Sequence, residues 1–268
     1  MSCDPRSLPL VSVVVPAYKH ESFVVSALQS VFDQDYPNVE LIVVDDASPD
    51  NTASAIGLWA GRSAVAARFR GMSFVSNGSN SGAHASINRG CAMAAGRYIA
   101  VLNSDDLFHP SRLSRLVDRL ISREGGLAFS RVVPIDDDGR LMSPVALPRE
   151  LTGVFHLADQ VYANSIDPAQ DLLRANFAIS TGNFVFHRDL YDAVGPFCDL
   201  KYCHDWDFIL RASLLADPIY VPEDLYFYRI HSSNSFSQLA GVASLETRVV
   251  RGRYQAAALA ARHRAGGA

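Results

Sequence analysis

The chain has 268 residues, is 49% apolar and carries a formal net charge of −4, so it can bury one large core or two small ones. Basic and acidic residues are interspersed, which argues against a nucleic-acid partner. The four cysteines form no C-x-x-C pair, no secretory leader begins the chain, and no apolar run approaches the ~20 residues that cross a bilayer. We therefore expect a cytoplasmic protein, soluble or peripheral to the inner face of the membrane.

The first part of the chain alternates predicted strands with predicted helices. The β-branched run "LVSVVVP" indicates a buried strand, and "ESFVVSALQSVFDQ" has the apolar face of a helix that ends at "DYPN". Further strands are predicted in "VELIVVDD", "MSFVSN" and "RYIAVLNSDD", with helices after residue 49 and over 82–96. This alternation predicts an α/β fold with a mostly parallel central sheet flanked by helices.

The second part is less regular. Helices are predicted over 110–122 and 201–211, and an apolar run over 127–133 is followed by a turn. Residues 144–175 are expected to form a loop with short helices, which we interpret as a lid on the acceptor side. The stretch "STGNFVFHRDLYDAVGPF" predicts a strand and a short helix, and "PIYVPEDLYFYRIH" predicts a pair of strands.

No composition break forces a second domain. We predict one domain over 1–239, with a nucleotide-binding half at about 10–109 and an acceptor half at about 110–239. The alanine-rich, arginine-bearing segment 240–268 is predicted to be a helical tail. Contact with an anionic membrane surface, a homodimer contact and a solvated helix face are all compatible with its composition.

Polar clusters follow three predicted strands, in "PAYKH" (16–20), "DDASPD" (45–50) and "NSDD" (103–106). The carboxyl ends of parallel strands meet at one edge of a sheet, where open α/β proteins bind ligands. Clustered carboxylates repel one another unless donors or a cation neutralise them. The alternative is that each pair of aspartates only caps the following helix. Either pair alone fits helix capping as well as it fits a ligand-binding site. Two pairs at one edge of the sheet favour the ligand-binding site.

Adjacent aspartates are typical ligands of Mn²⁺ or Mg²⁺, which substrate phosphates often complete, so a nucleoside diphosphate would suit such a site. The sequence contains no G-x-G-x-x-G after the first strand and no G-x-x-x-x-G-K-[ST], so neither motif accounts for phosphate binding. We therefore expect a divalent cation to bind the diphosphate.

Four segments, in order, resemble the family 2 glycosyltransferases: "VSVVVPAYKHESFVVSALQSVFDQDYPNVELIVVDDASPDNT", "NSGAHASINRGCAMAAGRYIAVLNSDD", "HDWDFILR" and "YRIHSSNS". The resemblance covers about residues 11–237. It implies a GT-A fold and an inverting transfer of a sugar from a UDP- or dTDP-linked donor to an acceptor hydroxyl, with a glycan or lipid-linked acceptor in surface polysaccharide or glycan synthesis.

The resemblance also implies roles for individual residues. Asp46 would accept a hydrogen bond from the nucleotide base, and Asp105, Asp106 and His231 would hold Mn²⁺ or Mg²⁺, although His231 also fits an ordinary strand histidine. The other residues expected on the donor side, together with Asp105, are Pro16, Ala17, Tyr18, Asn80, Gly82, His84, Asn88, Asn103 and Ser104. Those expected on the acceptor side are Thr181, Gly182, Asn183, His204 and Trp206.

The chain departs from the family pattern at three positions. Asn103 stands where the family often has the first aspartate of its D-x-D motif. Asparagine is neutral and therefore supplies less charge to a cation than aspartate does. Ile87 stands where an arginine commonly precedes Asn88, and His204 replaces the glutamate of the family's "ED" motif. Small residues in "GAHAS" fit close helix packing as well as donor binding, and Trp206 also fits a core position.

Attack at the anomeric carbon needs a base opposite the leaving group, so the base must come from a different segment than the metal-binding acids. The resemblance assigns this role to Asp205. Asp207 would project from another side of the same helix and is predicted to cap or orient.

Three other functions fit the sequence less well. A sugar nucleotidyltransferase would be expected to carry a glycine-rich basic loop after the first strand, and "PAYKHES" has no glycine. An idle nucleotide-sugar- or glycan-binding module would need no base. Hydrolysis of glycosides by paired carboxylates does not explain the nucleotide-facing motifs.

Overall fold

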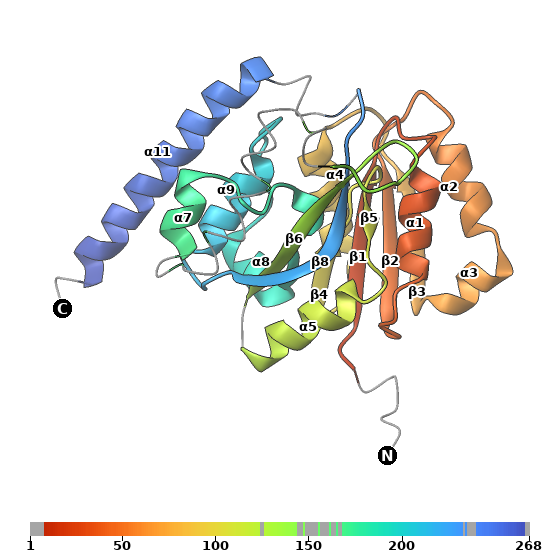
Figure 1. Ribbon diagram of the computed structural model, residues 1–268, viewed down its shortest axis with the longest axis horizontal. Helices are drawn as coiled ribbons and strands as arrows, with labels where there is room; N and C mark the ends of the chain where they lie inside the picture. Colours follow the sequence, from red (N-terminus) through yellow and green to blue (C-terminus); the bar gives the residue numbers. More distant parts are fainter. Residues whose placement is uncertain are drawn as a thin grey trace.

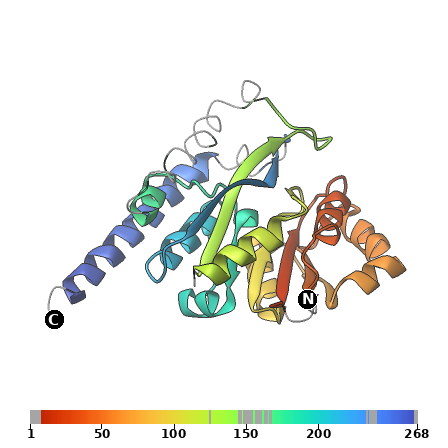
Figure 2. The ribbon, with the colours of Figure 1, turned by 60° about the horizontal axis from the view of Figure 1, so that its bottom comes forward.

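The computed structural model describes residues 8–123, 126–143, 147, 155, 161, 165, 168–232, 234 and 240–265, with backbone alone for 240 and 256–265. Across these residues one mixed sheet has the strand order β3-β2-β1-β4-β7-β6-β8-β5 (Figures 1 and 2). Its strands are β1 Val11–Ala17, β2 Val39–Asp45, β3 Gly71–Ser76, β4 Tyr98–Val101, β5 Leu107–Phe108, β6 Leu127–Ile135, β7 Val185–His187 and β8 Ile219–Arg229.

The predicted parallel region is confirmed for the first four long strands. Val11 of β1 aligns with Val39 of β2 and with Tyr98 of β4, and β2 pairs in parallel with β3, so all four strands end at one edge. Strand β7 is antiparallel to both β4 and β6, whereas β6 and β8 are again parallel. The mostly parallel α/β sheet is therefore as predicted, with β7 and β5 as its antiparallel members.

The helices cover the two faces of the sheet. One face packs against α1 Val24–Phe32, α2 Thr52–Ala60, α3 Ser63–Arg68 and α5 Arg112–Ser122. The other face packs against α4 Ala83–Met93, α7 Pro168–Arg174, α8 Arg188–Val194, α9 His204–Ala212 and α11 Ala240–Ala265. Alternating strand residues enter the two cores: Val13 belongs to the first core and Val14 to the second. Figure 1 shows α11 along the outer side of α9 and α7.

The predicted pair of strands over 218–231 is wrong, because β8 is continuous from Ile219 to Arg229. Pro222 lies at an irregularity in the pairing of β8 with β6, since Ser130 of β6 faces Val221 while the next residue faces Asp224. Proline has no N–H to donate and is tolerated at such bulges. The predicted acceptor-side lid (144–175) lies mostly outside the described residues, which include α7 within it.

Both predicted halves of the chain contribute strands to the same sheet, with β1 to β5 from the first half and β6 to β8 from the second. The division into halves stays a prediction. Among the residues that the structure describes, no helix is both long enough and apolar enough to cross a membrane.

Candidate active site

The loops that leave β1 and β2 are fastened to each other. The Asp46 N–H donates to the Ala17 carbonyl at 2.8 Å, and the Lys19 N–H donates to Ser48 Oγ at 3.1 Å. Lys19 and Ala47 both adopt φ of 57°, a left-handed conformation that residues with a side chain rarely adopt. Backbone of this kind persists where its surroundings fix it, commonly beside a ligand site.

Asp46 organises the loop between β3 and α4. Its carboxylate accepts hydrogen bonds from Asn77 Nδ2 at 2.6 Å and from the backbone N–H groups of Ser81 and Gly82 at 2.9 and 2.8 Å. A carboxylate has about four acceptor positions, so one remains for a ligand. The predicted contact between Asp46 and a nucleotide base stays a prediction.

The capping alternative for the two aspartate pairs is wrong. Asp50, not Asp45 or Asp46, accepts from the Thr52 N–H at the start of α2, at 3.1 Å. The Asp106 carboxylate turns away from α5 and accepts from the Arg229 N–H at 2.8 Å, from Asn103 Nδ2 at 3.1 Å and from the Tyr226 hydroxyl. The two pairs of aspartates therefore do not cap the helices that follow them.

A cluster of three potential metal ligands, His20, Asp105 and His231, lies at this edge, with its ligand atoms within 4.8 Å of one another. His231 Nε2 is 3.0 Å and His20 Nε2 is 3.6 Å from Asp105 Oδ2. His20 Nδ1 is 2.8 Å from Ser104 Oγ, a contact that orients the ring so that Nε2 faces Asp105. We call these three residues the metal trio.

The metal trio differs from the predicted ligand set. Asp105 and His231 belong to it, but Asp106 is replaced by His20, because its carboxylate is already occupied by Tyr226, Arg229 and Asn103. Burial and the charge of Asp105 raise the pKa of Asp106 well above its ordinary value. Burial would also raise the pKa of Asp105, but His20 and His231 hold it below its ordinary value.

The predicted base Asp205 is buried in the first turn of α9. Its Oδ2 accepts from Asn176 Nδ2 at 2.8 Å, and its Oδ1 accepts from the Trp206 N–H at 2.7 Å. Burial raises the pKa of Asp205 to about 7, although both hydrogen bonds oppose this shift. A carboxyl group with a pKa near neutrality can both take up and release a proton under physiological conditions.

Tyr228 of β8 is subject to the charges of both groups of acids. Burial raises its pKa well above the ordinary value, and the charges of Asp106, Asp105 and Asp205 raise it further. The acids after β4 and the carboxylate of α9, about 100 residues apart in sequence, therefore act electrostatically on the same side chain.

The other predicted acceptor-side residues lie in different surroundings. Thr181 Oγ1 lies 3.0 Å from His204 Nε2, so these two residues form a pair beside Asp205. Burial lowers the pKa of His204 to about 4. Trp206 donates from Nε1 to the Leu172 carbonyl at 2.7 Å and is buried, which agrees with its reading as a core residue.

Asn183 and Gly182 do not face an acceptor, which corrects the prediction. Asn183 is fully buried, and its Oδ1 accepts from the Ser130 N–H at 3.1 Å and from Arg112 at 3.1 Å. A Cβ on Gly182 would lie 2.0 Å from the Tyr226 hydroxyl, so glycine is required there for packing. Both residues join β6, β8 and α5 rather than bind substrate.

The predicted donor-side role of Asn88 is also corrected. Its side chain donates to the Phe197 carbonyl at 2.8 Å and accepts from the Phe197 N–H at 2.9 Å, which ties α4 to the segment before α9. The remaining predicted donor-side residues lie at the carboxyl edge: Pro16 and Ala17 at the end of β1, Tyr18, Asn80, Asn103 and Ser104 on loops, Gly82 at the start of α4 and His84 in its first turn. Gly82 has φ of +88° at the start of α4, so its backbone, not helix packing, requires glycine.

Two site residues were missed by the sequence-based prediction. His20 stands within the strand-end cluster "PAYKH", so its position was a usable signal. Asn176 follows α7 and reaches Asp205 across 29 positions, and no local pattern marks it.

A mixed sheet of this order, with acids and histidines at the ends of its parallel strands and a further carboxylate at the start of a neighbouring helix, defines the GT-A class of fold. The profile of Glycosyl transferase family 2 matches residues 12–195, and the chain belongs to this family.

The chain is 30% identical to the putative teichuronic acid biosynthesis glycosyltransferase TuaG of Bacillus subtilis over 145 residues, which are 54% of this chain and 55% of TuaG. It resembles S. aureus TarS 1-349 in complex with UDP-GlcNAc with a TM-score of 0.64 and 18% identity, over 85% of this chain and 60% of that one. The chain thus spans little more than half the length of both proteins.

It also resembles the mannosyltransferase PcManGT of Pyrobaculum calidifontis, in complex with GDP-Man and Mn²⁺, with a TM-score of 0.61 and 19% identity. This match covers 96% of the present chain and 77% of the other. At these identities the two solved structures establish the shared fold.

Proposed function

We propose that this protein is an inverting glycosyltransferase that moves a sugar from a nucleoside-diphosphate sugar to an acceptor hydroxyl. The observation that carries the proposal is Asp205, a buried carboxylate in the first turn of α9 that accepts from Asn176 and from the Trp206 N–H and whose pKa is raised to about 7. A fold that only bound nucleotide sugars would have no need of such a group.

Asp205 accepts the proton of the acceptor hydroxyl. At the same time the hydroxyl oxygen attacks the anomeric carbon from the face opposite the diphosphate. The bond between the anomeric carbon and the diphosphate oxygen breaks, and the nucleoside diphosphate leaves. Attack from the opposite face inverts the configuration at the anomeric carbon. Asn176 and the Trp206 N–H fix the carboxylate during this transfer.

The metal trio fits a divalent cation. Two imidazole nitrogens and one carboxylate oxygen lie within 4.8 Å of one another, and Ser104 orients one of the imidazoles. Imidazole is a poor ligand for Mg²⁺ and a good one for first-row transition metals, so this donor set favours Mn²⁺ over Mg²⁺. When bound, such an ion would neutralise charge on the diphosphate leaving group.

The donor is a UDP- or dTDP-linked sugar in this proposal. Asp46 keeps one acceptor position free, and an acceptor there suits the ring N–H of uracil or thymine. The fold relatives are solved with UDP-GlcNAc and with GDP-Man, so both enter the test as candidate donors.

The acceptor is a growing glycan or a lipid-linked sugar in surface polysaccharide synthesis. TuaG is named for teichuronic acid biosynthesis, which supports this class of acceptor. Contact of α11 with a membrane or with a second copy of the chain stays a prediction. Arg248, Arg251 and Arg253 are all exposed, and Arg251 and Arg253 also contact Trp206 and Asp207 of α9.

The test is release of nucleoside diphosphate from UDP-, dTDP- and GDP-linked sugars, with Mn²⁺ or Mg²⁺ and a pool of acceptor glycans. We expect turnover with a uridine or thymidine donor and a loss of about 10²- to 10⁴-fold in Asp205→Asn, with donor binding retained. An Asp205→Asn variant that turns over like the unmodified chain would disprove the base. A donor that binds without acceptor-dependent release would instead indicate a binding module.

A further inference from the structure

The segment that precedes the base-bearing helix is held by a residue of the C-terminal helix. Glu246 of α11 accepts hydrogen bonds from the backbone N–H groups of Lys201, Tyr202 and Cys203, each at 2.9 Å. These residues are followed at once by α9, whose second residue is Asp205. Three consecutive donors therefore converge on one carboxylate, which we call the Glu246 clamp.

The clamp fixes the residue at which α9 begins. No side chain caps α9 at Cys203, and Glu246 accepts from the N–H of Cys203 itself and from those of the two residues before it. Burial would raise the pKa of Glu246, yet the three backbone donors and His204 lower it. The carboxylate is therefore ionised at neutral pH, the state that a helix N-terminus stabilises.

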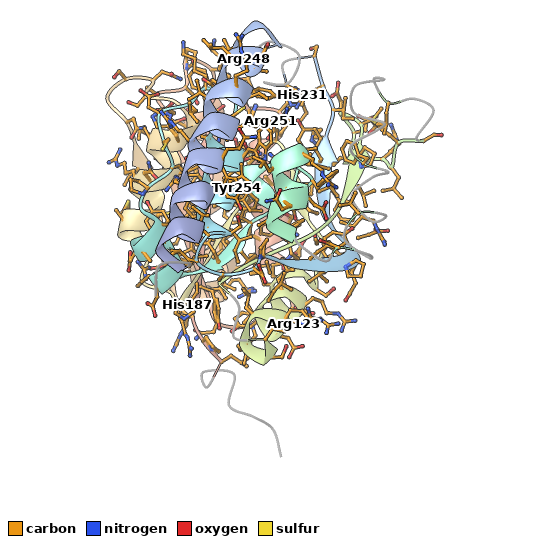
Figure 3. The ribbon with its side chains drawn as sticks, turned by 90° about the vertical axis from the view of Figure 1, so that its left-hand side faces the viewer. Arg123, His187, His231, Arg248, Arg251 and Tyr254 are labelled. Atoms are coloured by element: carbon orange, nitrogen blue, oxygen red, sulfur yellow. The ribbon has the colours of Figure 1, made fainter. Side chains whose placement is uncertain are left out.

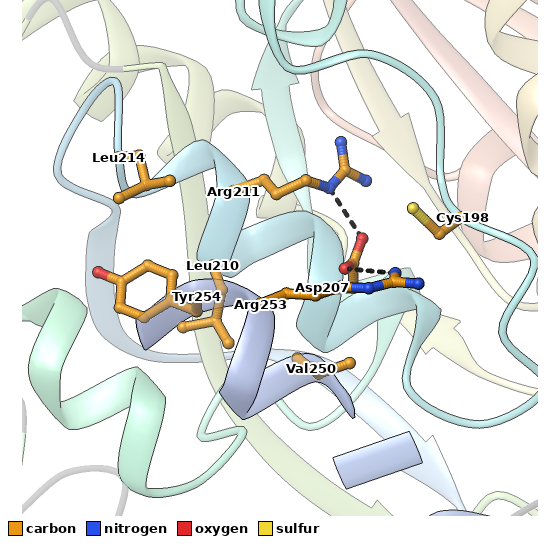
Figure 4. A pocket seen from close by; sticks show the side chains of 8 residues that line it. All are labelled: Cys198, Asp207, Leu210, Arg211, Leu214, Val250, Arg253 and Tyr254. Carbon is orange, nitrogen blue, oxygen red and sulfur yellow. Dashed lines mark hydrogen bonds and ion pairs between the residues drawn. The ribbon is translucent and has the colours of Figure 1, made fainter. Parts of the chain in front are cut away.

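Further contacts hold α11 on the outside of α9 and so fix the position of Glu246 relative to α9. Val250 and Tyr254 are buried in the same core as α9. Arg253 lies 3.7 Å from the buried Asp207, which also accepts from Arg211 at 2.8 Å; Figure 4 shows both contacts. Figure 3 shows Arg248, Arg251 and Tyr254 on successive turns of α11.

The base side of α9 is touched by the same helix. The guanidinium of Arg251 lies 5.4 Å from the centre of the Trp206 ring, and Trp206 follows Asp205 directly. Leu172 of α7 accepts from Trp206, and Asn176, which follows α7, donates to Asp205. The first turn of α9 is thus held by both α7 and α11, which also contact each other through Arg251 and the Arg174 carbonyl.

We propose that Glu246 is a positioning residue for the base, which makes α11 part of the active site rather than a tail. The proposal rests on the proposed function of Asp205. A base must be held within a fraction of an ångström of its working position, and displacement of the first turn of α9 would move its carboxylate directly.

The charge of Glu246 gives a signature that a purely structural role would lack. The groups that face Asp205 are Glu246 from α11, Tyr202 and Cys203 from the preceding segment, Tyr228 from β8 and Asn176 after α7. The Glu246 carboxylate raises the pKa of Asp205, so its neutralisation lowers that pKa. The acid limb of the kcat/KM profile against pH then moves to lower pH.

The experiment compares Glu246→Gln, Glu246→Asp and the control Glu223→Gln, an acid of β8 that pairs with Arg115. For Glu246→Gln we expect kcat to fall about tenfold, the donor KM to change less than twofold, the acid limb to move to lower pH, and the amides of 201–203 to exchange hydrogen faster. Glu246→Asp keeps the charge but has a shorter reach, so its kcat falls while its acid limb stays. The control matches the unmodified chain.

The outcomes separate failure of the proposed function from failure of the positioning role of Glu246. An unmodified chain without turnover on any donor overturns the proposed function, and this inference with it. An active chain whose Glu246→Gln variant keeps its kcat and its pH profile overturns the inference alone. If Glu246→Gln does not fold, Glu246→Asp decides: an unchanged kcat in that variant overturns the positioning role.

Discussion

Asn176 donates a hydrogen bond of 2.8 Å from Nδ2 to Oδ2 of Asp205, and its own Oδ1 is buried without a partner in the part of the chain that the structure describes. The amide thus holds the base with one end and has a free acceptor at the other. A buried acceptor without a partner is costly unless a ligand satisfies it. In the proposed function, a hydroxyl of the sugar acceptor other than the attacking one would donate to this oxygen.

Replacement of Asn176 by alanine should move the pH profile upward. Its N–H lowers the pKa of Asp205, so its loss raises that pKa, and the acid limb of kcat/KM moves up by roughly one pH unit. This direction is opposite to that expected for Glu246→Gln. The measurement is kcat/KM between pH 5 and 9, with the exposed Asn51→Ala as control. A limb that does not move would refute the hydrogen bond's role.

Replacement of His20 by alanine should weaken Mn²⁺ binding. His20 contributes one of the three ligand atoms of the metal trio, and loss of a ligand is expected to lower affinity at least ~10-fold. Calorimetric titration with Mn²⁺ measures this without turnover. His109→Ala is the matched control, because His109 binds Ser111 in its own loop. Equal affinities in both variants would remove His20 from the site.

Asp106→Asn should leave Mn²⁺ affinity within about threefold of the unmodified chain. The Asp106 carboxylate is bound by Tyr226, Arg229 and Asn103 and does not belong to the metal trio. The same calorimetric titration, run beside Asp105→Asn, makes the comparison. We expect Asp105→Asn to abolish binding. A parallel loss in both variants would return Asp106 to the ligand set.

Much of this arrangement was predictable from the sequence, because it depends on local patterns. The β-branched runs give the parallel strands, and the acids after them mark the ligand edge. The errors come from long-range partners. Asp106 and Asn183 have the composition of ligand-binding residues, but Tyr226 and Arg112, brought in by folding, satisfy them inside the core. Asn176 and Glu246 reach the base from other segments, which no period in the sequence encodes.

Asn183→Ala should lower stability rather than acceptor affinity. Removal of the amide leaves the Ser130 backbone N–H without its partner, and it takes one hydrogen bond from Arg112, a fully buried cation that keeps Ser130 Oγ and the carbonyl of residue 183. The expected cost is about 2–4 kcal/mol in the free energy of unfolding. Urea denaturation measures the loss, and the exposed Asn80→Ala should stay within about 0.5 kcal/mol of the unmodified chain. A stable variant with a raised acceptor KM would restore Asn183 to the acceptor side.

Asp205→Asn should make the protein more stable at alkaline pH. The pKa of Asp205 is about 7 in the folded state and near 3.8 in the unfolded chain. Between these values the unfolded chain gives up this proton while the folded protein keeps it, so the contribution of Asp205 to stability is lost as pH rises from about 4 to 7.

Asparagine does not titrate and removes this loss. The gain in the free energy of unfolding from Asp205→Asn should therefore be on the order of 2 kcal/mol larger at pH 8 than at pH 5. Urea denaturation at both pH values measures it, and the exposed Asp217→Asn should show the same difference from the unmodified chain at each pH. A gain that does not grow with pH would mean that Asp205 is ionised in the folded protein throughout this range. Asp205 would then lack the near-neutral pKa on which its role as the base depends.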